Sequence, residues 1–225
     1  MAIRKTLCVA AMCLFIFSVP ARLHSQSLLQ PESLKAQAPA KYRVKFVTTK
    51  GPFVVEVTRA WAPLGADRFY NLVKNGFFTD ASFFRVVPNF VVQFGLSANP
   101  QVSMAWTEAR IPDDPVAQSN VRGTLTFATA GKNTRTTQLF INLKDNTRLD
   151  QMHFSPFGKV VEGIAVVDKL YSGYGDAPPG GSGPDQSRIT NEGKAYLDKE
   201  FPKLDSIKSA TIEPEPAAKS AKEKK

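Results

Sequence analysis

Two runs of sequence decide the fold of this chain: FFRVVPNFVVQFG at Phe83–Gly95 and GTLTFATAGKNTRTTQLFINL at Gly123–Leu143. In the first run, Arg85 stands among large apolar side chains, and Gln93 follows beyond a Pro88-Asn89 turn. Because a strand points alternate side chains to opposite faces, Arg85 and Gln93 are expected on one face of a hairpin. A cation in an apolar strand is costly to bury unless it is paired or functional. The runs therefore predict β structure around an apolar groove with a few polar groups, the usual form of a small binding site.

The rest of the chain consists of short apolar segments separated by turn residues. Tyr42–Thr48 and Phe53–Thr58 alternate as strands do, with a turn sequence between them, so they predict a hairpin. The spacing of apolar residues predicts one helix over 63–75 and a second at about 163–171. A last strand is expected at 206–212, paired with the first. Together these segments are typical of a mainly β fold, a closed β-barrel capped by two helices.

The C-terminal part extends beyond a compact barrel. Gly175–Asp185 is rich in Gly and Pro and is expected to be an irregular loop. Ile189–Phe201 has helical spacing and ends before Pro202. These segments predict a loop-helix extension at 174–205. The last residues, 213–225, are rich in Pro, Ala, Lys and Glu, which predicts a disordered basic tail.

The N-terminus has the composition of a secretory signal peptide. Two basic residues precede an apolar run at 6–19, which is too short to span a bilayer comfortably. Small residues fit cleavage after Ala21, which gives a signal peptide at 1–21. Cleavage near Ser25 or Ser27 and an uncleaved anchor are the alternatives. We expect an exported, periplasmic protein with no stable membrane insertion after cleavage.

The composition excludes several classes of site. The chain has 225 residues and is 43% apolar, enough for one sizeable core. Both cysteines, Cys8 and Cys13, lie in the apolar leader, and the only histidines are His24 and His153. The mature chain thus lacks material for a disulfide or a multi-histidine site, and we expect no metal and no cofactor. The formal charge of +9 comes with no nucleic-acid motif, so we expect solvated lysines and no nucleic-acid partner.

A third run, LDQMHFSPFGKVVEG at Leu149–Gly163, completes a pattern shared with a known family. The family's signature reads roughly F-H-R-[IV]-[IV]-P-x-F-x-x-Q-x-G, then G-x-[LI]-x-[MF]-A-N-A-G-x-N-[TS]-x-x-[ST]-Q-F-F-I, then L-D-x-x-x-x-x-F-G-x-V-x-x-G. Because all three occur in order between about Lys41 and Gly173, the chain resembles the cyclophilin family of peptidyl-prolyl isomerases. The positions kept in the first two runs are Phe83, Arg85, Pro88, Phe90, Gln93, Gly95, Gly123, Leu125, Ala128, Ala130, Gly131, Asn133, Thr134, Gln138, Phe140 and Ile141.

The resemblance implies a fold, an activity and a site. The fold would be a closed barrel of eight antiparallel strands with a helix over each open end. The activity would be cis-trans isomerisation of X–Pro bonds (EC 5.2.1.8) in unfolded or extended Pro-containing polypeptides, by a monomer that assists the folding of exported proteins. Arg85 would be the catalytic residue. The residues implied to bind substrate are Phe90, Val91, Gln93, Ala128, Thr129, Gln138, Phe140, Leu149 and His153.

Several positions depart from the family's pattern. Phe84 stands where histidine is common, and Thr129 stands where the family has asparagine. Arg148 stands where cyclosporin-sensitive members carry tryptophan, so weak cyclosporin binding is expected. The third run has one extra residue, so His153 is the nearest match to the family's pocket histidine and Phe154 is the alternative.

These observations predict one cyclophilin-like domain at 41–212, preceded by a flexible arm at 22–40. The alternative function is a non-catalytic cyclophilin-fold chaperone that holds Pro-containing segments. A third class is an envelope protein tethered by the basic tail. For Arg85, the alternative to catalysis is an ion pair that braces the barrel wall.

Overall fold

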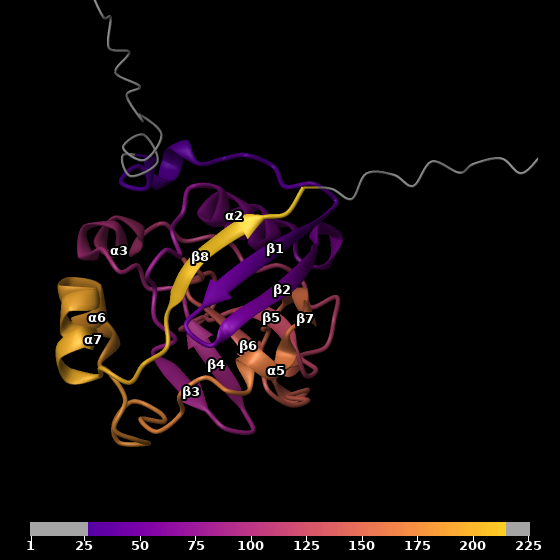
Figure 1. Cartoon of the computed structure of the whole chain (residues 1–225). Helices are drawn as coiled ribbons and strands as arrows, with labels where there is room; N and C mark the ends of the chain where they lie inside the picture. The colour runs from indigo at the N-terminus through magenta and orange to yellow at the C-terminus, as the bar shows by residue number, and fades with distance from the viewer. Residues whose placement is uncertain (1–26, 215–225) are drawn as a thin grey trace, which may run out of the picture.

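The computed structural model describes residues 27–214. The expected signal peptide at 1–21 and most of the expected tail at 213–225 lie outside the described residues. Within them, eight strands form one antiparallel sheet that curls around the core (Figure 1). Its spatial order is β3-β4-β6-β5-β7-β2-β1-β8. The strands are β1 Lys41–Thr48, β2 Gly51–Thr58, β3 Arg85–Val87, β4 Val91–Phe94, β5 Thr124–Phe127, β6 Leu139–Asn142, β7 Pro156–Glu162 and β8 Ile207–Ile212.

The expected hairpins are confirmed. β1 and β2 pair from Lys41–Thr58 to Thr48–Gly51, and β8 pairs with β1 as the last strand. The segment before β3 meets the start of β8 through short backbone contacts, among them an isolated bridge between Ser82 and Ser206. No ladder joins β3 to β8 among the described strands. The structure thus shows a curled half-barrel, and the closed barrel stays an expectation.

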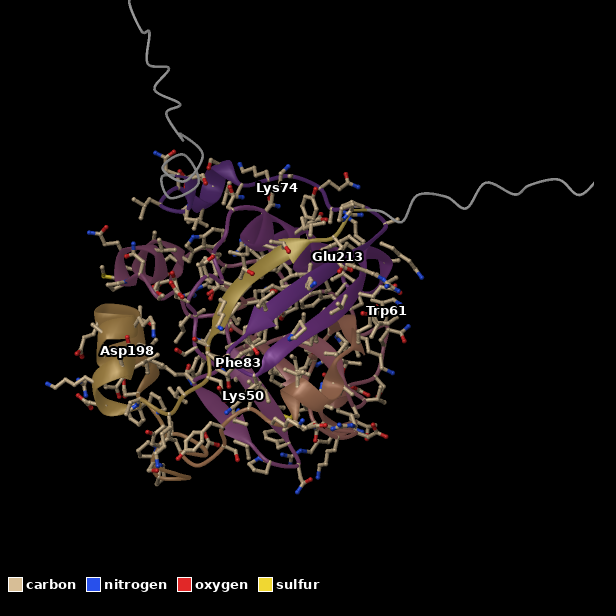
Figure 2. The ribbon with its side chains drawn as sticks, viewed as in Figure 1. Lys50, Trp61, Lys74, Phe83, Asp198 and Glu213 are labelled. Atoms are coloured by element: carbon tan, nitrogen blue, oxygen red, sulfur yellow. The ribbon has the colours of Figure 1, made fainter. Side chains whose placement is uncertain are left out.

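Aromatic rings fill the space inside the sheet. The ring of Phe46 on β1 lies 4.8 Å from that of Phe53 and 6.0 Å from that of Phe94, centroid to centroid. Phe83 is fully buried and packs on Phe94 (Figure 2). Fully burying each such side chain contributes about 1.5–3 kcal/mol.

Helix α2 (Pro63–Lys74) lies against the inside of the sheet and buries Phe69 on Phe46 and Phe157. Its first turn is held by Asp114, whose carboxylate accepts two backbone N–H groups at 3.0 and 2.9 Å. A negative charge is favourable there because the first-turn N–H groups have no partner within the helix and the positive end of the helix dipole points toward the carboxylate. This helix agrees with the one predicted over 63–75.

The other helices differ more from expectation. The helix predicted at about 163–171 is only α5 (Ile164–Val167), because Lys169 N and Leu170 N donate to carbonyls three residues back, Val166 O and Val167 O, where an α-helix would use the fourth. α3 (Pro100–Trp106) was not predicted. Within residues 27–214, no helix is long and apolar enough to cross a bilayer. The remaining helices are α4 Arg148–Gln151, α6 Gln186–Glu192 and α7 Lys194–Glu200, with 3-10 turns η1 Pro31–Ser33 and η2 Arg59–Trp61.

The extension at 174–205 carries two helices where the sequence predicted one over 189–201. Gly193 breaks them with a φ of +63°, and a side chain there would collide with the carbonyl of Ala98. The extension covers Phe84, which packs with Ile189, Tyr196 and Leu197. This contact accounts for an apolar residue where the family commonly has histidine.

Residues 27–40, expected to belong to a flexible arm, lie on the domain. The carbonyl of Leu28 accepts from the indole N–H of Trp106 at 2.8 Å. The Asn71 side chain exchanges two hydrogen bonds with the backbone of Ala36, at 3.1 and 2.7 Å. The composition of this segment predicted a flexible arm, but its residues are hydrogen-bonded to α2 and α3. These partners lie far away in the sequence, so the local composition does not reveal them.

Candidate functional site

The β3–β4 hairpin places Arg85 directly opposite Gln93 and Val87 opposite Val91. The turn between the strands needs a left-handed residue, and Asn89 supplies it with a φ of +57°. Arg85 Nη1 donates to Gln93 Oε1 at 3.1 Å. Arg85 and Gln93 therefore lie on the same face of the hairpin, as the alternation of side chains along the strand predicted.

A chain of side-chain amides continues from Arg85 into the sheet. Gln93 is buried, and its Nε2 donates to Gln138 Oε1 at 2.9 Å. The backbone carbonyl of Gln138 in turn accepts from Ala128 N at 2.9 Å. Gln138 is partly exposed, and its side-chain oxygen fixes the amide of Gln93.

Next to this polar row is an apolar pocket of about 240 Å³. Its floor is a small cluster of Val91, Phe140 and Leu149, with Phe154 packed edge-on against Phe140 at 5.5 Å between ring centroids. The guanidinium carbon of Arg85 lies 5.6 Å from the ring centroid of Phe90 at the rim. The pocket is lined by Arg85, Phe90, Val91, Gln93, Ala128, Thr129, Phe140, Arg148, Leu149, Met152 and Phe154.

A second cavity of about 860 Å³ adjoins the pocket and shares Thr129, Met152 and Phe154 with it. The structure places His153 in the wall of this cavity, exposed and with a φ of +62°. The two alternatives from the sequence are thus separated. Phe154 faces the apolar pocket, whereas His153 does not line it.

The guanidinium of Arg85 is also held by a carboxylate from the extension. Nε lies 2.7 Å from Asp176 Oδ1, and Nη2 lies 2.8 Å from Asp176 Oδ2. The hydrogen bonds from Arg85 hold the pKa of the Asp176 carboxyl below its usual range. The ion pair considered as an alternative role for Arg85 therefore exists. It lies beside the pocket, and Arg85 retains further N–H donors.

Comparison with known proteins identifies this arrangement. The family model described as cyclophilin type peptidyl-prolyl cis-trans isomerase matches residues 43–192. The chain belongs to the cyclophilin family. Cyclophilins are peptidyl-prolyl cis-trans isomerases (EC 5.2.1.8), so the enzyme class expected from the sequence is confirmed.

Two bacterial relatives carry the same activity in their names. The chain is 36% identical over 143 residues to a peptidyl-prolyl cis-trans isomerase of Acinetobacter baylyi, a match that covers 61% of this chain and 76% of the relative. It is 32% identical over 148 residues to peptidyl-prolyl cis-trans isomerase A of Dickeya dadantii, covering 61% and 78%.

A solved structure shares the fold. A cyclophilin type peptidyl-prolyl cis-trans isomerase from Cryptosporidium parvum, crystallised in the presence of the dipeptide Ala-Pro, matches with a TM-score of 0.58 at 20% identity. The match covers 77% of this chain and 99% of that chain. It supports the mainly β fold of curled antiparallel strands with helices.

Sequence reasoning missed three residues of this cyclophilin site. Met152 lines the pocket, Arg148 was assigned only a place in drug sensitivity, and Asp176 was treated as part of an irregular loop. The rule that a cation in an apolar strand needs a partner does call for a carboxylate near Arg85. It does not say which of the 20 acidic residues supplies it.

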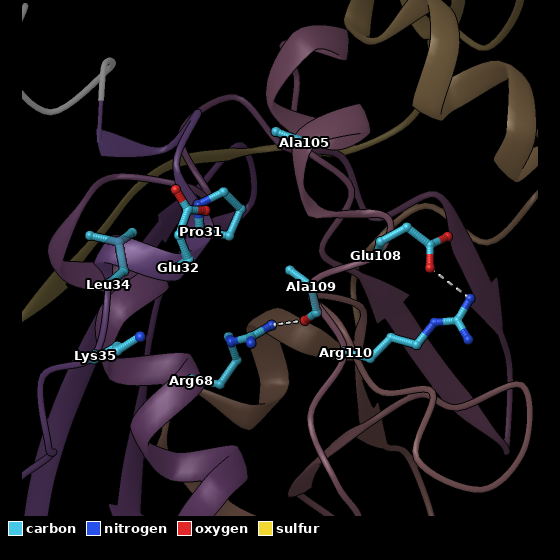
Figure 3. Close-up of a pocket in the computed structure, with 9 residues that line it drawn as sticks. All are labelled: Pro31, Glu32, Leu34, Lys35, Arg68, Ala105, Glu108, Ala109 and Arg110. Atoms are coloured by element: carbon cyan, nitrogen blue, oxygen red, sulfur yellow. Dashed lines mark hydrogen bonds and ion pairs between the residues drawn. The ribbon is translucent and has the colours of Figure 1, made fainter.

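Another depression, which shares no lining residue with this pocket, lies between the N-terminal segment and α3 (Figure 3). Its volume is about 430 Å³, and Arg68 lies at its base. Arg68 Nη1 donates to the carbonyls of Ala109 and Thr136 at 2.6 and 3.0 Å. Burial lowers the pKa of Arg68 to about 10. These bonds give Arg68 a structural role, tying α2 to two loops.

None of the three cavities described above has the side chains of a metal centre. Within residues 27–214, no group of three or more His, Cys, Asp and Glu side chains is placed to hold a metal ion.

Proposed function

We propose that this cyclophilin isomerises X–Pro bonds with Arg85 as its catalytic residue, acting on extended segments of exported polypeptides. The observation that carries the proposal is the position of the Arg85 guanidinium at the rim of a small apolar pocket, beside the amide of Gln93. The pocket accommodates a proline ring, and the polar row accommodates the backbone next to it.

The reaction needs a hydrogen-bond donor more than a nucleophile. Resonance gives the peptide C–N bond double-bond character, with a barrier to rotation of about 18–20 kcal/mol. In the twisted transition state this resonance is lost, and the prolyl nitrogen becomes pyramidal and basic. A donor on that nitrogen binds the twisted state better than either planar isomer, which lowers the barrier. Arg85 supplies N–H groups at the pocket rim for this purpose.

The pocket residues have separate parts in this proposal. Phe90, Val91, Phe140 and Leu149 hold the proline ring, because their apolar side chains form one contiguous surface. Gln93 and the backbone at Ala128–Thr129 hold the preceding carbonyl and chain. The Cryptosporidium parvum relative crystallised in the presence of Ala-Pro supports a Pro-containing peptide as ligand.

The proposal that the protein acts on exported polypeptides rests on the sequence of its N-terminal leader. A basic start and an apolar run at 6–19 support export and cleavage after Ala21. N-terminal sequencing of the protein recovered from the periplasmic fraction tests this, and retention of Met1 in the cytoplasm would contradict it. We propose a monomer, and light scattering tests that.

Closure of the barrel is also part of the proposal. The bridge between Ser82 and Ser206, together with Phe83 N donating to Asp205 O at 2.9 Å, supports contact between the sheet's outer edges. Slow hydrogen exchange of the Phe83 amide is expected if this edge stays closed.

The decisive experiment measures cis-to-trans exchange in a Pro-containing peptide. Arg85→Ala is expected to lower kcat/KM by about 10²–10³-fold, the effect of removing a key transition-state donor. Arg122→Ala is a matched control, because Arg122 also pairs with an aspartate, Asp168, at 2.7 Å but lies outside the pocket. Normal activity of a folded Arg85→Ala protein would remove Arg85 from the mechanism. A wild-type protein that binds the peptide without accelerating exchange would favour the chaperone alternative.

A further inference from the structure

The contact between Arg85 and Asp176 joins the pocket to the extension. Two N–H groups of the guanidinium, on Nε and Nη2, meet the two carboxylate oxygens of Asp176 at 2.7 and 2.8 Å. Such a two-point contact between planar groups fixes the plane of the guanidinium as well as its position. Figure 1 shows the loop that carries Asp176, coloured orange, running beside β3.

The loop is built around Asp176. Gly183 N donates to the Asp176 carbonyl at 2.8 Å, and Ala177 N donates to Asp176 Oδ1 at 2.8 Å. The backbone of Gly181 comes so close to that of Asp176 that a side chain at 181 would collide with it. The Gly-rich sequence, which suggested only irregularity, thus allows the loop to close tightly and hold the carboxylate in place.

The contacts of Arg85 show which of its N–H groups remain free to bind a ligand. A guanidinium carries five N–H groups. Asp176 accepts two and Gln93 accepts one, from Nη1 at 3.1 Å. One N–H on Nη1 and one on Nη2 have no acceptor among the described residues. The side chain of Arg85 is 20% exposed and lines the pocket.

We propose that Asp176 is a positioning residue, which holds the guanidinium of Arg85 so that its two remaining N–H groups face the prolyl nitrogen. This inference rests on the proposed catalytic role of Arg85. Asp176 touches Arg85 and does not line the pocket. The pKa of Asp176 is held below its usual range, so the carboxylate is ionised at neutral pH.

The carboxylate also has an opposing effect, since its negative charge weakens Arg85 as a donor. The weakening of the donor is the smaller of two effects on the rate, because the prolyl nitrogen gains only partial charge as the bond twists. The larger effect is misplacement of the guanidinium, since a shift of about 1 Å in a catalytic group can cost about 10²-fold in rate. Removal of the carboxylate should therefore lower the rate rather than raise it.

The test compares Asp176→Asn with Asp168→Asn, which alters an Arg–Asp pair outside the pocket. For Asp176→Asn we expect kcat to fall by about 10- to 10²-fold and the affinity for a Pro-containing peptide to stay nearly unchanged. Asp168→Asn should leave both at the wild-type values. Asp176→Glu keeps the charge and should recover part of the lost rate.

A spectroscopic readout separates positioning from a general effect on the fold. The Nε–H signal of Arg85 in a ¹⁵N-labelled protein should shift and exchange faster with water in Asp176→Asn than in Asp168→Asn. In an Arg85→Ala background, Asp176→Asn should cause no further loss, because both changes act through one group.

The outcomes distinguish this inference from the proposed function. An inactive wild-type protein, or an unaffected Arg85→Ala variant, would overturn the proposed function. An impaired Arg85→Ala variant together with a fully active Asp176→Asn variant would overturn only the positioning role. An unchanged Arg85 Nε–H signal in Asp176→Asn would overturn it as well.

Discussion

Arg85 and Gln93 face each other across the β3–β4 ladder, and the 3.1 Å hydrogen bond between Nη1 and Oε1 ties the guanidinium to the pocket wall. Gln93 is itself tied to Gln138 at 2.9 Å. The orientation of the cation is therefore set by the sheet on one side and by the extension on the other.

Gln93→Ala is expected to lower kcat/KM by about 10- to 10²-fold. Hydrogen bonds to a charged group contribute about 1.5–3 kcal/mol, and about 1.4 kcal/mol corresponds to a factor of ten in rate. Gln138→Ala should have a smaller effect, because Gln138 acts one bond further from Arg85. A peptide exchange assay on both variants checks the order, and equal effects would contradict it.

Arg148→Trp is expected to tighten cyclosporin binding. Arg148 lines the apolar pocket, and the resemblance to the family places it where sensitive members carry tryptophan. An indole adds an apolar face and one N–H donor. Titration of the inhibitor against the exchange rate measures the affinity. Lys169→Trp adds the same side chain outside the pocket and should change nothing; a gain there equal to that of Arg148→Trp would show that the position is misassigned.

Asp114→Ala is expected to destabilise the fold by about 3–5 kcal/mol, the usual cost of leaving one partner of a buried ion pair unpaired. Asp114 lies 3.0 Å from Arg135, and both side chains are nearly inaccessible, at 3% and 4% exposure. Asp113→Ala, next to it and 23% exposed, should cost under about 1 kcal/mol.

Urea unfolding of both variants gives the free energies. If Asp114→Ala does not accumulate as folded protein, Asp114→Asn keeps the shape and should still lose more stability than Asp113→Ala. Equal losses at the two positions would argue against a special role for the buried pair.

Acid should remove stability through Asp150. Burial alone would raise the pKa of this carboxyl, but hydrogen bonds from Ser119 and Asn120 outweigh burial and hold the pKa below its usual range. Since the folded-state pKa is depressed, the contribution is complete above the ordinary aspartate pKa of about 3.9 and is lost as pH falls through the lower folded value.

Asp150→Asn should therefore flatten the dependence of the unfolding free energy on pH in the acid range. Ser119→Ala, which removes one of the donors, should flatten it less. Urea titrations at several acid pH values give the slopes. A slope in Asp150→Asn equal to the wild-type slope would contradict the assignment.

The parts of the fold that could be predicted depend on local pattern. The β1–β2 hairpin and α2 follow from residue alternation, helical spacing and turn residues within each segment. The pocket residues from β3, β4 and β6 follow from the resemblance of contiguous motifs to a family. Each of these signals lies within about 20 residues of sequence.

The parts that could not be predicted depend on distant contacts. The break at Gly193 is set by the carbonyl of Ala98, which no local pattern reveals. The carboxylate on Arg85 comes from 91 positions later in the chain. His153 and Phe154 are neighbours in sequence, and only the backbone at φ +62° decides which of them faces the pocket.

The pairing of β1 with β8 bears on the order of events during synthesis. Val44, near the N-terminal edge of the domain, lies opposite Ile212, near its C-terminal edge. A ribosome must therefore synthesise the chain through Ile212 before the sheet can receive all of its last strand. Until then, β1 has β2 as its only neighbour, and its other backbone edge stays open to water or to any holding factor that binds extended chains.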